Sequence, residues 1–535
     1  MNGNESGRRT ERPAGSRRGR PAGSCADPGL FSRVHDVIIL GGGILGTMTA
    51  WKLSRYDLDV VVLDRAYDVG EGSAKANSGI LYPGFQHRGG SLKGISCVRG
   101  SRMYDEICRD LDIPMKRVGA LYVTFHEEGD HEMRKKYQRG LENGTPGMEI
   151  LSGREARRME PLLSKKVRNA LYTPSVGILS PFTLIISLAE AAAENGVKFL
   201  FGCEAEGIEL PQEEAPTAAR EKGREAARED AAKEFPPIRV VTPRGTLSSR
   251  FLVNTAGENA AELEGFVRPR DLVIRPRRGQ FYVFDKQETP VLRHVIYQAQ
   301  ETDEGGTLIA PTIEGNLIAG PTSENVRSYQ NTDTTREGLA HVERVAKKIL
   351  PDLDMGRVIT NFAGVRANIT NVDKEHKDFV LRRSAPRMVS ALGIKNPGMT
   401  AAPYLAESMI ALLREEGLVT EEKADYRPRR KRQKPFLQSD RKEQQALYAK
   451  DPRYARVICR CEGITEGDLL HVLHSPLPPA SLNGFKKRLR TGMGRCQGSF
   501  CTSRILEIVC RETGCLPEEF CKSTEGSRLV KGRLK

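Results

Sequence analysis

The sequence lacks the long apolar segments that cross membranes. Its 535 residues contain no uninterrupted apolar run of about 18 residues, the length that a spanning helix needs. The N-terminus also lacks the charged and apolar regions of a secretory signal. We therefore expect a cytoplasmic protein with reduced thiols, whose contact with a membrane is at most peripheral.

The sequence also lacks the pattern of a nucleic-acid-binding surface, although its formal net charge is +14. Residues 1–35, 420–456 and 457–535 carry net charges of +4, +6 and +5, which leaves residues 36–419 close to neutral. The arginines near the N-terminus lie among Gly, Ser and Pro, which is typical of a solvated tail. Nucleic-acid binding needs basic residues organised with aromatic ones on a folded surface, so we expect no nucleic-acid partner.

The segment that follows the tail has the pattern of a dinucleotide-binding unit. The apolar run Asp36–Leu40 leads into Gly41-Gly-Gly-Ile-Leu-Gly46, a helical stretch and a second apolar run that ends in Asp64. Gly41 permits a tight turn, Gly43 lets the backbone approach a pyrophosphate, and Gly46 lets the helix pack on the sheet. Asp64 can accept a hydrogen bond from a ribose hydroxyl, and the N–H groups at the helix start can bind the phosphates.

Later segments predict how the rest of the main body is built. No second G-x-G-x-x-G occurs between a strand and a helix, which argues against a flavoprotein with its own NAD(P) domain. The apolar segments Val197–Phe201 and Phe251–Gly257 are predicted to join the first sheet. From Asp271 to about Gly320 the pattern changes to alternating strands and turns, which predicts a second, sheet-based lobe.

Several blocks of the sequence resemble a known family. In order they are Asn77-Ser-Gly-Ile80, Gly84, residues 90–100, Val253-Asn-Thr-Ala-Gly257, Gly364-Val-Arg366 and residues 393–398. Over roughly residues 36–412 this succession resembles the D-amino-acid-oxidase-type FAD-dependent oxidoreductases. Within that superfamily it is most similar to the large subunit of anaerobic glycerol-3-phosphate dehydrogenase and to L-2-hydroxyglutarate oxidases. The resemblance implies FAD as cofactor and hydride transfer from a secondary alcohol on a small anionic substrate.

The resemblance also implies which residues hold FAD. The glycines of the first turn and Asp64 would bind the ADP half. The residues implied near the pyrophosphate, the dinucleotide and the flavin ring are Ser73, Asn77, Ser78, Gly257, Pro397, Gly398, Met399 and Thr400. A helix that begins near Gly398 would point its positive end at negative charge on the flavin.

Arginine and tyrosine are the candidate catalytic residues. The guanidinium of Arg366 is planar and permanently charged, so it matches a carboxylate or phosphate, and this position faces the flavin in the family. Arg278 is a further candidate for the same role. Tyr82 stands where the relatives usually have His, and an unperturbed Tyr, with a pKa of about 10, is a poor base. We expect Tyr82 to orient the substrate or pack on the flavin, while His87, His376 or another group accepts the proton.

Cysteines are concentrated near the C-terminus. Cys459-Arg-Cys461 and Cys496-Gln-Gly-Ser-Phe-Cys501 give two close pairs, which suit a 2Fe-2S cluster or a structural zinc. The block resembles the bacterioferritin-associated-ferredoxin-like domain, which implies a 2Fe-2S cluster. Flavins accept two electrons at once, whereas such clusters pass single electrons. A flavin and a cluster in one protein would therefore transfer electrons onward to an acceptor. The remaining C-terminal cysteines, Cys510, Cys515 and Cys521, are expected to be core or incidental thiols.

These interpretations together predict an α/β protein. It would have a Rossmann-like FAD-binding domain, an inserted mixed-sheet (α+β) substrate lobe and a small C-terminal iron-sulfur domain. The expected boundaries are a disordered basic tail at 1–34, the oxidoreductase domain at 35–412, a basic linker at 413–455, the 2Fe-2S-binding domain at 456–522 and a tail at 523–535. Within the oxidoreductase domain we expect the substrate lobe at about 100–180 and 270–360 and a charged insertion at 212–235.

The preferred activity is oxidation of sn-glycerol 3-phosphate to dihydroxyacetone phosphate. Electrons would leave through the cluster to an electron-accepting protein subunit or a quinone-linked partner. The alternatives are an L-2-hydroxyglutarate or other 2-hydroxy-acid dehydrogenase, an amine or imino-acid dehydrogenase, and an electron-relay subunit without its own substrate. The replacement of His by Tyr82 favours the relay, whereas the preserved Gly364-Val-Arg366 argues against it.

Overall fold

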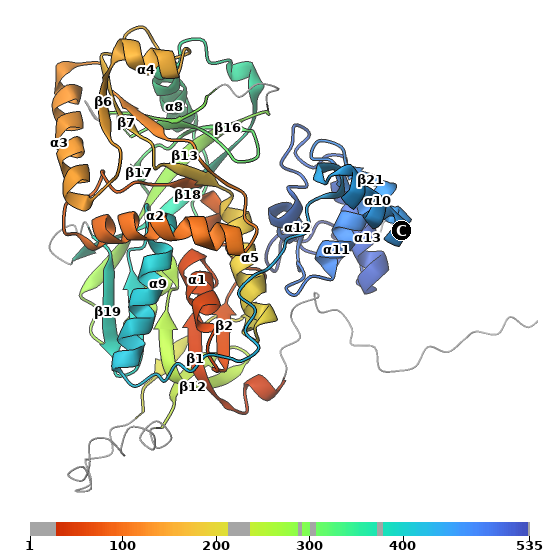
Figure 1. Cartoon of the computed structure of the whole chain (residues 1–535). Helices are drawn as coiled ribbons and strands as arrows, with labels where there is room; N and C mark the ends of the chain where they lie inside the picture. Colours follow the sequence, from red (N-terminus) through yellow and green to blue (C-terminus); the bar gives the residue numbers. More distant parts are fainter. Residues whose placement is uncertain (1–27, 212–235, 287–291, 300–305, 372–377, 533–535) are drawn as a thin grey trace, which may run out of the picture.

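The computed structural model describes residues 28–211, 236–286, 292–299, 306–371 and 378–532 (Figure 1). The expected charged insertion at 212–235 and most of the expected tail therefore lie outside the described residues. The end of that tail is part of the fold instead, because Leu30 is buried and its carbonyl oxygen accepts a hydrogen bond from His35 Nε2 at 2.8 Å. Residues 28–34, which the sequence assigned to the disordered tail, are therefore part of the folded main body.

The first sheet is built around five parallel strands, in the spatial order β9, β2, β1, β12 and β20. The bounds of these strands are β1 (Val34–Leu40), β2 (Val60–Asp64), β9 (Lys198–Phe201), β12 (Gly245–Asn254) and β20 (Met388–Leu392). Antiparallel strands extend the sheet at β12 and β20: β10 (Gly207–Glu209), β11 (Ile238–Thr242) and β19 (Val380–Ala385). Residues 37–40 and 60–63 are at most 2% exposed, since both faces of the sheet are covered.

Helices cover the sheet face formed by Val37, Ile39, Val60 and Val62. These helices are α1 (Ile44–Leu53), α2 (Leu92–Asp110), α5 (Pro181–Glu194) and α9 (Gly398–Glu415). The short helix α7 (Ala260–Glu264) contributes Leu263 to the cluster on the other face. A strand, the glycine turn, a helix and a second strand follow one another as the sequence predicted. This arrangement confirms the predicted α/β class.

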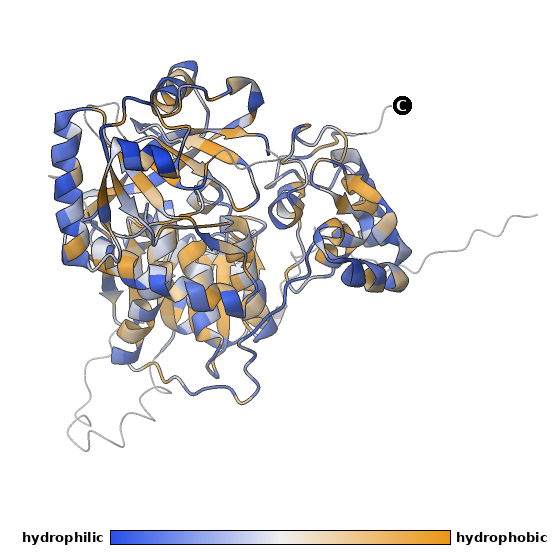
Figure 2. Cartoon of the chain, turned by 45° about the horizontal axis from the view of Figure 1, so that its top comes forward, coloured by the Kyte–Doolittle hydropathy of each residue, from blue (hydrophilic) through white to orange (hydrophobic). Residues whose placement is uncertain are grey.

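A second, mixed sheet forms the other half of the main body. Its strands are β5 (Ala120–Val123), β6 (Glu149–Ser152), β7 (Asn169–Thr173), β13 (Leu272–Phe284), β14 (Val295–Gln298), β15 (Leu308–Pro311), β16 (Leu317–Gly320), β17 (Glu324–Asn325) and β18 (Val358–Asn371). Helices α3 (Glu127–Asn143), α4 (Gly153–Met159) and α8 (Arg336–Ile349) accompany it. Hydrophobic residues concentrate in the strands, whereas α3 is largely hydrophilic (Figure 2).

Two long antiparallel strands, β13 and β18, connect this sheet to the first one. Their register places Arg277 opposite Arg366 and Gly279 opposite Gly364. The chain segments between the two sheets are η2 (Ser73–Ala76), which contacts β18, and a small sheet of β3 (Ile80–Leu81), β4 (Met115–Arg117) and β8 (Gly177–Leu179). Residues from both sheets therefore meet where β18 passes η2.

The C-terminal residues form a body beside the main one (Figure 1). Its elements are β21 (Val457–Cys459), β22 (Ile464–Thr465), α11 (Glu466–Leu473), α12 (Leu482–Leu489) and α13 (Thr502–Thr513), and they enclose their own hydrophobic cluster. The preceding segment, which the sequence predicted as a linker, contains helix α10 (Arg441–Lys450). None of the described helices is both long and apolar enough to span a bilayer.

Buried ion pairs join the C-terminal body to the main body. Arg488 Nη1 lies 2.6 Å from Asp68 Oδ2, and Lys487 Nζ lies 2.8 Å from Glu71 Oε1 and 3.3 Å from Asp68. All four side chains are less than 10% exposed. Burial alone would raise the pKa of Asp68, but Arg488 and Lys487 hold it below its usual value.

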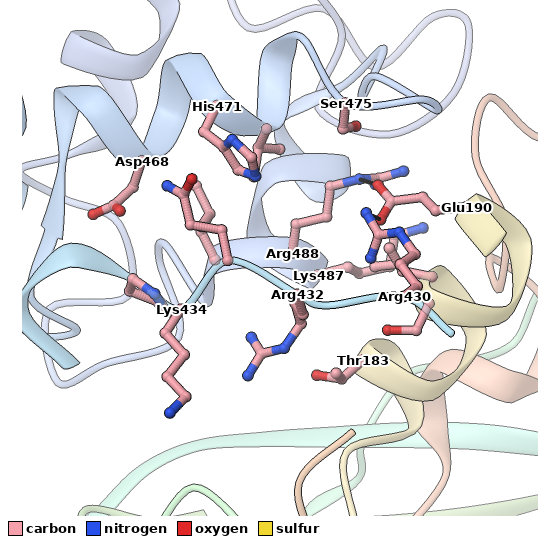
Figure 3. Close-up of a pocket in the computed structure, with 16 residues that line it drawn as sticks. Thr183, Glu190, Arg430, Arg432, Lys434, Asp468, His471, Ser475, Lys487 and Arg488 are labelled. Carbon is pink, nitrogen blue, oxygen red and sulfur yellow. Dashed lines mark ion pairs between the residues drawn. The ribbon is translucent and has the colours of Figure 1, made fainter. Parts of the chain in front are cut away.

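The basic segment 427–434 also takes part in this junction. Arg430 Nη2 lies 2.7 Å from Glu190 Oε2 on α5, and its Nε lies 3.0 Å from Glu194. Figure 3 shows Arg430 and Arg488 converging on Glu190 beside the cavity that this segment lines. Because the side chain of Arg430 is only 13% exposed, this part of the predicted linker is bound to the main body and is not solvated.

Replacement of Arg488 by Met should destabilise this junction by about 3 kcal/mol. Removal of one partner leaves Asp68 buried with Lys487 alone, and breaking a buried ion pair typically costs about 3–5 kcal/mol. Arg495→Met is the control, because Arg495 is 78% exposed and pairs with Asp285 across the same interface, where the loss should stay below about 1 kcal/mol. The loss of stability in each variant is measured by urea unfolding and by the rate of tryptic cleavage within residues 413–455. Equal losses in the two variants would contradict the role given to Arg488.

Candidate functional site

The glycine turn after β1 leaves a free surface at the start of α1. A Cβ on Gly46 would collide with the carbonyl oxygen of Gly41, and Gly41 itself has φ +99°. A Cβ on Gly43, in contrast, would meet nothing within 4 Å, and Gly43 caps α1 without a side-chain hydrogen bond. The first N–H groups of α1 therefore face open space, which suits a pyrophosphate.

Asp64 lies at the end of β2 beside this turn. Its Oδ2 accepts a hydrogen bond from the N–H of Gly42 and its Oδ1 one from the N–H of Ala66, both at 2.8 Å. Burial raises the pKa of Asp64 to about 6, although both hydrogen bonds favour the ionised form. A carboxylate has about four acceptor positions, so two remain for ribose hydroxyls. The turn, the helix start and this carboxylate together fit the ADP half of FAD.

Residues predicted for the flavin end lie where η2 meets β18. Ser73 Oγ donates to the carbonyl oxygen of Val365 at 2.8 Å, and Asn77 Oδ1 accepts from the N–H of Gly79 at 2.8 Å. Gly364 packs against Ala76 so closely that it has no room for a Cβ. Gly257 has φ +59°, and a Cβ on it would meet nothing within 4 Å, so its backbone also borders open space.

Helix α9 brings its N-terminus to Tyr82. The N–H of Tyr82 donates to Thr400 Oγ1 at 2.9 Å, and its buried hydroxyl is hydrogen-bonded to Ser78 and Asn396. The sequence residues Pro397, Gly398 and Met399 form the start of this helix. A Cβ on Gly100 of α2 would collide with the Thr400 carbonyl oxygen, so the two helices cross at this glycine. The structure thus brings Tyr82, Ser78 and Thr400 together.

Two residues of this site were not predicted. Asn396 lies in a block that was quoted for the family resemblance, but it was given no role. The ring of Tyr297, from β14, lies 6.0 Å from that of Tyr82 between centroids, and its buried hydroxyl has no hydrogen-bond partner among the described residues. Tyr297 sits in an ordinary apolar strand, so no signal in the sequence could have singled it out.

Arg366 extends from β18 toward Tyr82, whose phenol interacts with it electrostatically. Its Nη2 donates to the carbonyl oxygen of Thr322 at 3.3 Å, and its guanidinium packs so closely on Gly279 of the neighbouring strand β13 that Gly279 has no room for a Cβ. No carboxylate among the described residues forms an ion pair with Arg366. Burial lowers its pKa, and Arg277 adds to this effect. A partly buried cation without an acidic partner is suited to bind an anion.

Arg278 is held differently, and its candidacy as an anion ligand is not supported. Its Nη2 lies 2.7 Å from Glu324 Oε2, and its Nη1 donates to Asn331 Oδ1 at 2.9 Å. Gln280 Nε2 donates to the other oxygen of Glu324 at 2.6 Å. Arg278 therefore already has a carboxylate partner, and its role in this network is to hold β13 and β17 together.

The two histidines considered as bases have different outcomes. Burial, together with the charges of Lys93 and Lys136, lowers the pKa of His87 to about 3. His87 therefore stays neutral at physiological pH and is a weak base for a hydroxyl proton. His376 lies outside the described residues.

The four predicted ligand cysteines lie close together as two pairs. The thiol of Cys459 interacts with that of Cys501, and the thiol of Cys461 with that of Cys496. Backbone N–H groups of Glu462 and Gly492 near Cys459, and of Gly498 and Phe500 near Cys496, favour the ionised form of these thiols. In the described part of the chain, no group of three or more His, Cys, Asp or Glu residues is placed so that it could hold a metal ion.

The chain is similar to a family of oxidoreductases and to two kinds of dehydrogenase. Residues 36–412 match the sequence profile of a family described as FAD dependent oxidoreductase. A glycerol 3-phosphate dehydrogenase of Caloramator mitchellensis is 35% identical over 504 residues, which cover 94% of this chain and 99% of that protein. A mitochondrial L-2-hydroxyglutarate dehydrogenase of Arabidopsis thaliana is 24% identical over 397 residues, which cover 70% of this chain and 82% of that protein.

A solved structure has a similar fold. It is the dithionite-reduced L-alpha-glycerophosphate oxidase from Mycoplasma pneumoniae with FAD bound, with a TM-score of 0.66 and 23% identity. The match covers 75% of this chain and 100% of that one. The part of this chain outside the match is thus about a quarter of its length.

Asp64 should make the stability of the flavin-free protein depend on pH. Its pKa is about 6 when folded and near the usual 3.8 when unfolded. The folded state therefore binds more protons between these values, so its stabilising contribution is lost as the pH rises through that window. We expect wild type to lose about 2 kcal/mol relative to Asp64→Asn between pH 4 and 7. Urea unfolding measures this difference, and a value that does not change with pH would contradict the assignment.

Proposed function

The chain belongs to the family of FAD-dependent oxidoreductases, and on this premise we propose that it oxidises sn-glycerol 3-phosphate to dihydroxyacetone phosphate. One observation carries the proposal. Arg366 is a partly buried cation without a carboxylate partner among the described residues, and it faces the Tyr82 hydroxyl beside the predicted flavin site. A phosphate ester would supply the missing anion. The 35% identity to a glycerol 3-phosphate dehydrogenase along 94% of the chain supports the same substrate.

Several parts of the chain would hold FAD, which accepts a hydride from the alcohol carbon when it is bound. The N–H groups at the start of α1 would bind the pyrophosphate, and Asp64 would accept hydrogen bonds from the ribose. Ser73, Asn77, Ser78 and Gly257 would line the dinucleotide between η2 and β12. The N-terminus of α9, formed by residues 397–400, would bring its positive end to the flavin.

Tyr82 and Arg366 would contact different parts of the substrate. Arg366 would hold the phosphate and so fix the distance of the alcohol carbon from the flavin. Burial raises the pKa of Tyr82, so its hydroxyl keeps its proton at neutral pH. Tyr82 would therefore orient the substrate by hydrogen bonding and would not act as the base. This is consistent with the loss of the usual His at this position.

We further propose that Cys459, Cys461, Cys496 and Cys501 hold a 2Fe-2S cluster. Support comes from the pairing of the four thiols and from the nearby N–H groups that favour the ionised thiols, because N–H groups close to the sulfurs stabilise thiolate ligands of iron-sulfur clusters. The cluster would pass electrons to an acceptor protein or a quinone-linked partner. An oxidation of L-2-hydroxyglutarate is the second candidate, because its carboxylate would also suit Arg366 and a relative with that activity matches 70% of the chain.

Addition of sn-glycerol 3-phosphate should promptly bleach the visible absorbance of anaerobic holoprotein, whereas L-2-hydroxyglutarate and proline should not. Arg366→Ala should need about tenfold to a hundredfold more substrate while it keeps its FAD, because it loses charge-assisted hydrogen bonds. Arg275→Ala is the control, since Arg275 is exposed on the neighbouring β13 strand. Bleaching by another compound would reassign the substrate. Bleaching by dithionite alone would favour the electron-relay alternative.

Iron analysis of cysteine variants tests the cluster. Cys459→Ser and Cys496→Ser should each lose most iron and acid-labile sulfide, since each removes one ligand from a different pair. Cys510→Ser should keep both, because this thiol lies outside the two pairs. Zinc in place of iron in anaerobically purified wild type would refute the cluster.

A further inference from the structure

Cys510 and Cys515 lie in contact at the end of helix α13. Their sulfur atoms are 3.6 Å apart. The helix ends at Gly514, whose left-handed conformation, with φ +71°, turns the chain back, and the N–H of Gly514 donates to the carbonyl oxygen of Cys510 at 2.9 Å. This turn brings two thiols together that the sequence analysis treated as core or incidental.

In the described part of the chain, this pair is more accessible than the other thiols outside the proposed cluster. Buried thiols are Cys97, Cys108 and Cys203 in the main body and Cys521 in the C-terminal body. Cys510 and Cys515 are both partly exposed. A small solute can therefore reach the pair from solvent.

We propose that Cys510 and Cys515 are a redox-active pair that forms a reversible disulfide when the protein meets a peroxide. A disulfide bond is about 2.05 Å long, so the two sulfurs need to approach by about 1.5 Å. Cys515 lies in the surface turn that follows the helix, where rotation of its side chain supplies this movement. Neither thiol belongs to the four proposed cluster ligands, so the reaction leaves those ligands in place.

The two sulfurs have different roles in the reaction. Burial, together with contact with Cys515, raises the pKa of Cys510 to about 12, so Cys510 stays a thiol at neutral pH. Cys515 is therefore the sulfur that attacks hydrogen peroxide: the S–O bond of a sulfenic acid forms, the O–O bond breaks and one water leaves. The Cys510 sulfur then displaces the hydroxyl from the sulfenic acid, which forms the S–S bond and releases a second water. Two thiols lose two electrons in total, and one peroxide gains them.

The disulfide would close the C-terminal turn of α13. This helix follows directly on Cys501, and Ile505, Ile508 and Val509 anchor it in the C-terminal hydrophobic cluster. A covalent link between its last turns and residue 515 restricts unfolding from that end. Oxidation should thus stabilise the helix that begins beside a proposed cluster ligand.

Peptide mapping of the peroxide-treated holoprotein tests the proposal directly. Trypsin cleaves after Arg504, Arg511 and Lys522, which places Cys510 and Cys515 on two separate peptides. We expect these peptides to appear as one linked species, two hydrogens lighter than their sum, which dithiothreitol separates. Cys521 shares the second peptide, so Cys521→Ser is the control and should keep the link. Absence of the link in wild type, or its persistence in Cys515→Ser, would overturn the proposal.

Trapping of the intermediate tests the order of the two steps. In Cys510→Ser, dimedone should label Cys515 after peroxide treatment, because no second thiol is available to resolve the sulfenic acid. In Cys515→Ser, Cys510 should remain unlabelled. The melting temperature of the C-terminal body should rise on oxidation of wild type and of Cys521→Ser only. Equal labelling in both variants, or an equal rise in melting temperature in all four proteins, would contradict the mechanism.

Discussion

The buried ion pair between Asp68 and Arg488 is the contact on which the arrangement of the two bodies depends. Asp68 lies in the loop of residues 65–72, which leads from Asp64 at the end of β2 to Ser73 in η2. An unpaired carboxylate at this depth would cost several kcal/mol, so the loop can bury Asp68 only when the C-terminal body is docked. The same loop joins the predicted ribose and flavin ends of the site. Docking of the cysteine-bearing body and the shape of the flavin site are therefore coupled through one short segment.

The nucleotide-binding half could be predicted from sequence because its determinants are local. The turn needs Gly41 for its positive φ and Gly46 for the close approach of helix and strand, and both requirements fall within six residues. The strands on either side are short apolar runs that have no other way to be buried. Asp64 follows from the same unit, because it ends the second strand. In such a unit, residues that are close in the sequence are also close in the structure.

The substrate side could be predicted only in part, because its contacts connect distant segments. Tyr82 meets Tyr297 and Asn396, which are more than 200 residues away along the chain. Arg278 was an open candidate until the structure paired it with Glu324 on a different strand. Residues 413–455 were predicted as a basic linker, yet Arg430 in this segment is largely buried against α5. In each case, the partner of a charged or aromatic residue decides its role, and the sequence does not name the partner.

Partners also distinguish the buried arginines of this protein from one another. Arg278 and Arg488 each have a carboxylate at 2.6–2.7 Å, so the desolvation of both charges is offset within the fold. Among the described residues, Arg366 is hydrogen-bonded to a carbonyl oxygen at 3.3 Å and to no carboxylate, which offsets little of the cost of removing a guanidinium from water. Such a cost can be offset by a bound anion, because the low dielectric that destabilises an unpaired guanidinium also strengthens its attraction to an anion. The absence of a carboxylate beside Arg366 in the described part of the chain, more than its position in a motif, is therefore the physical basis of the proposal that it binds the substrate.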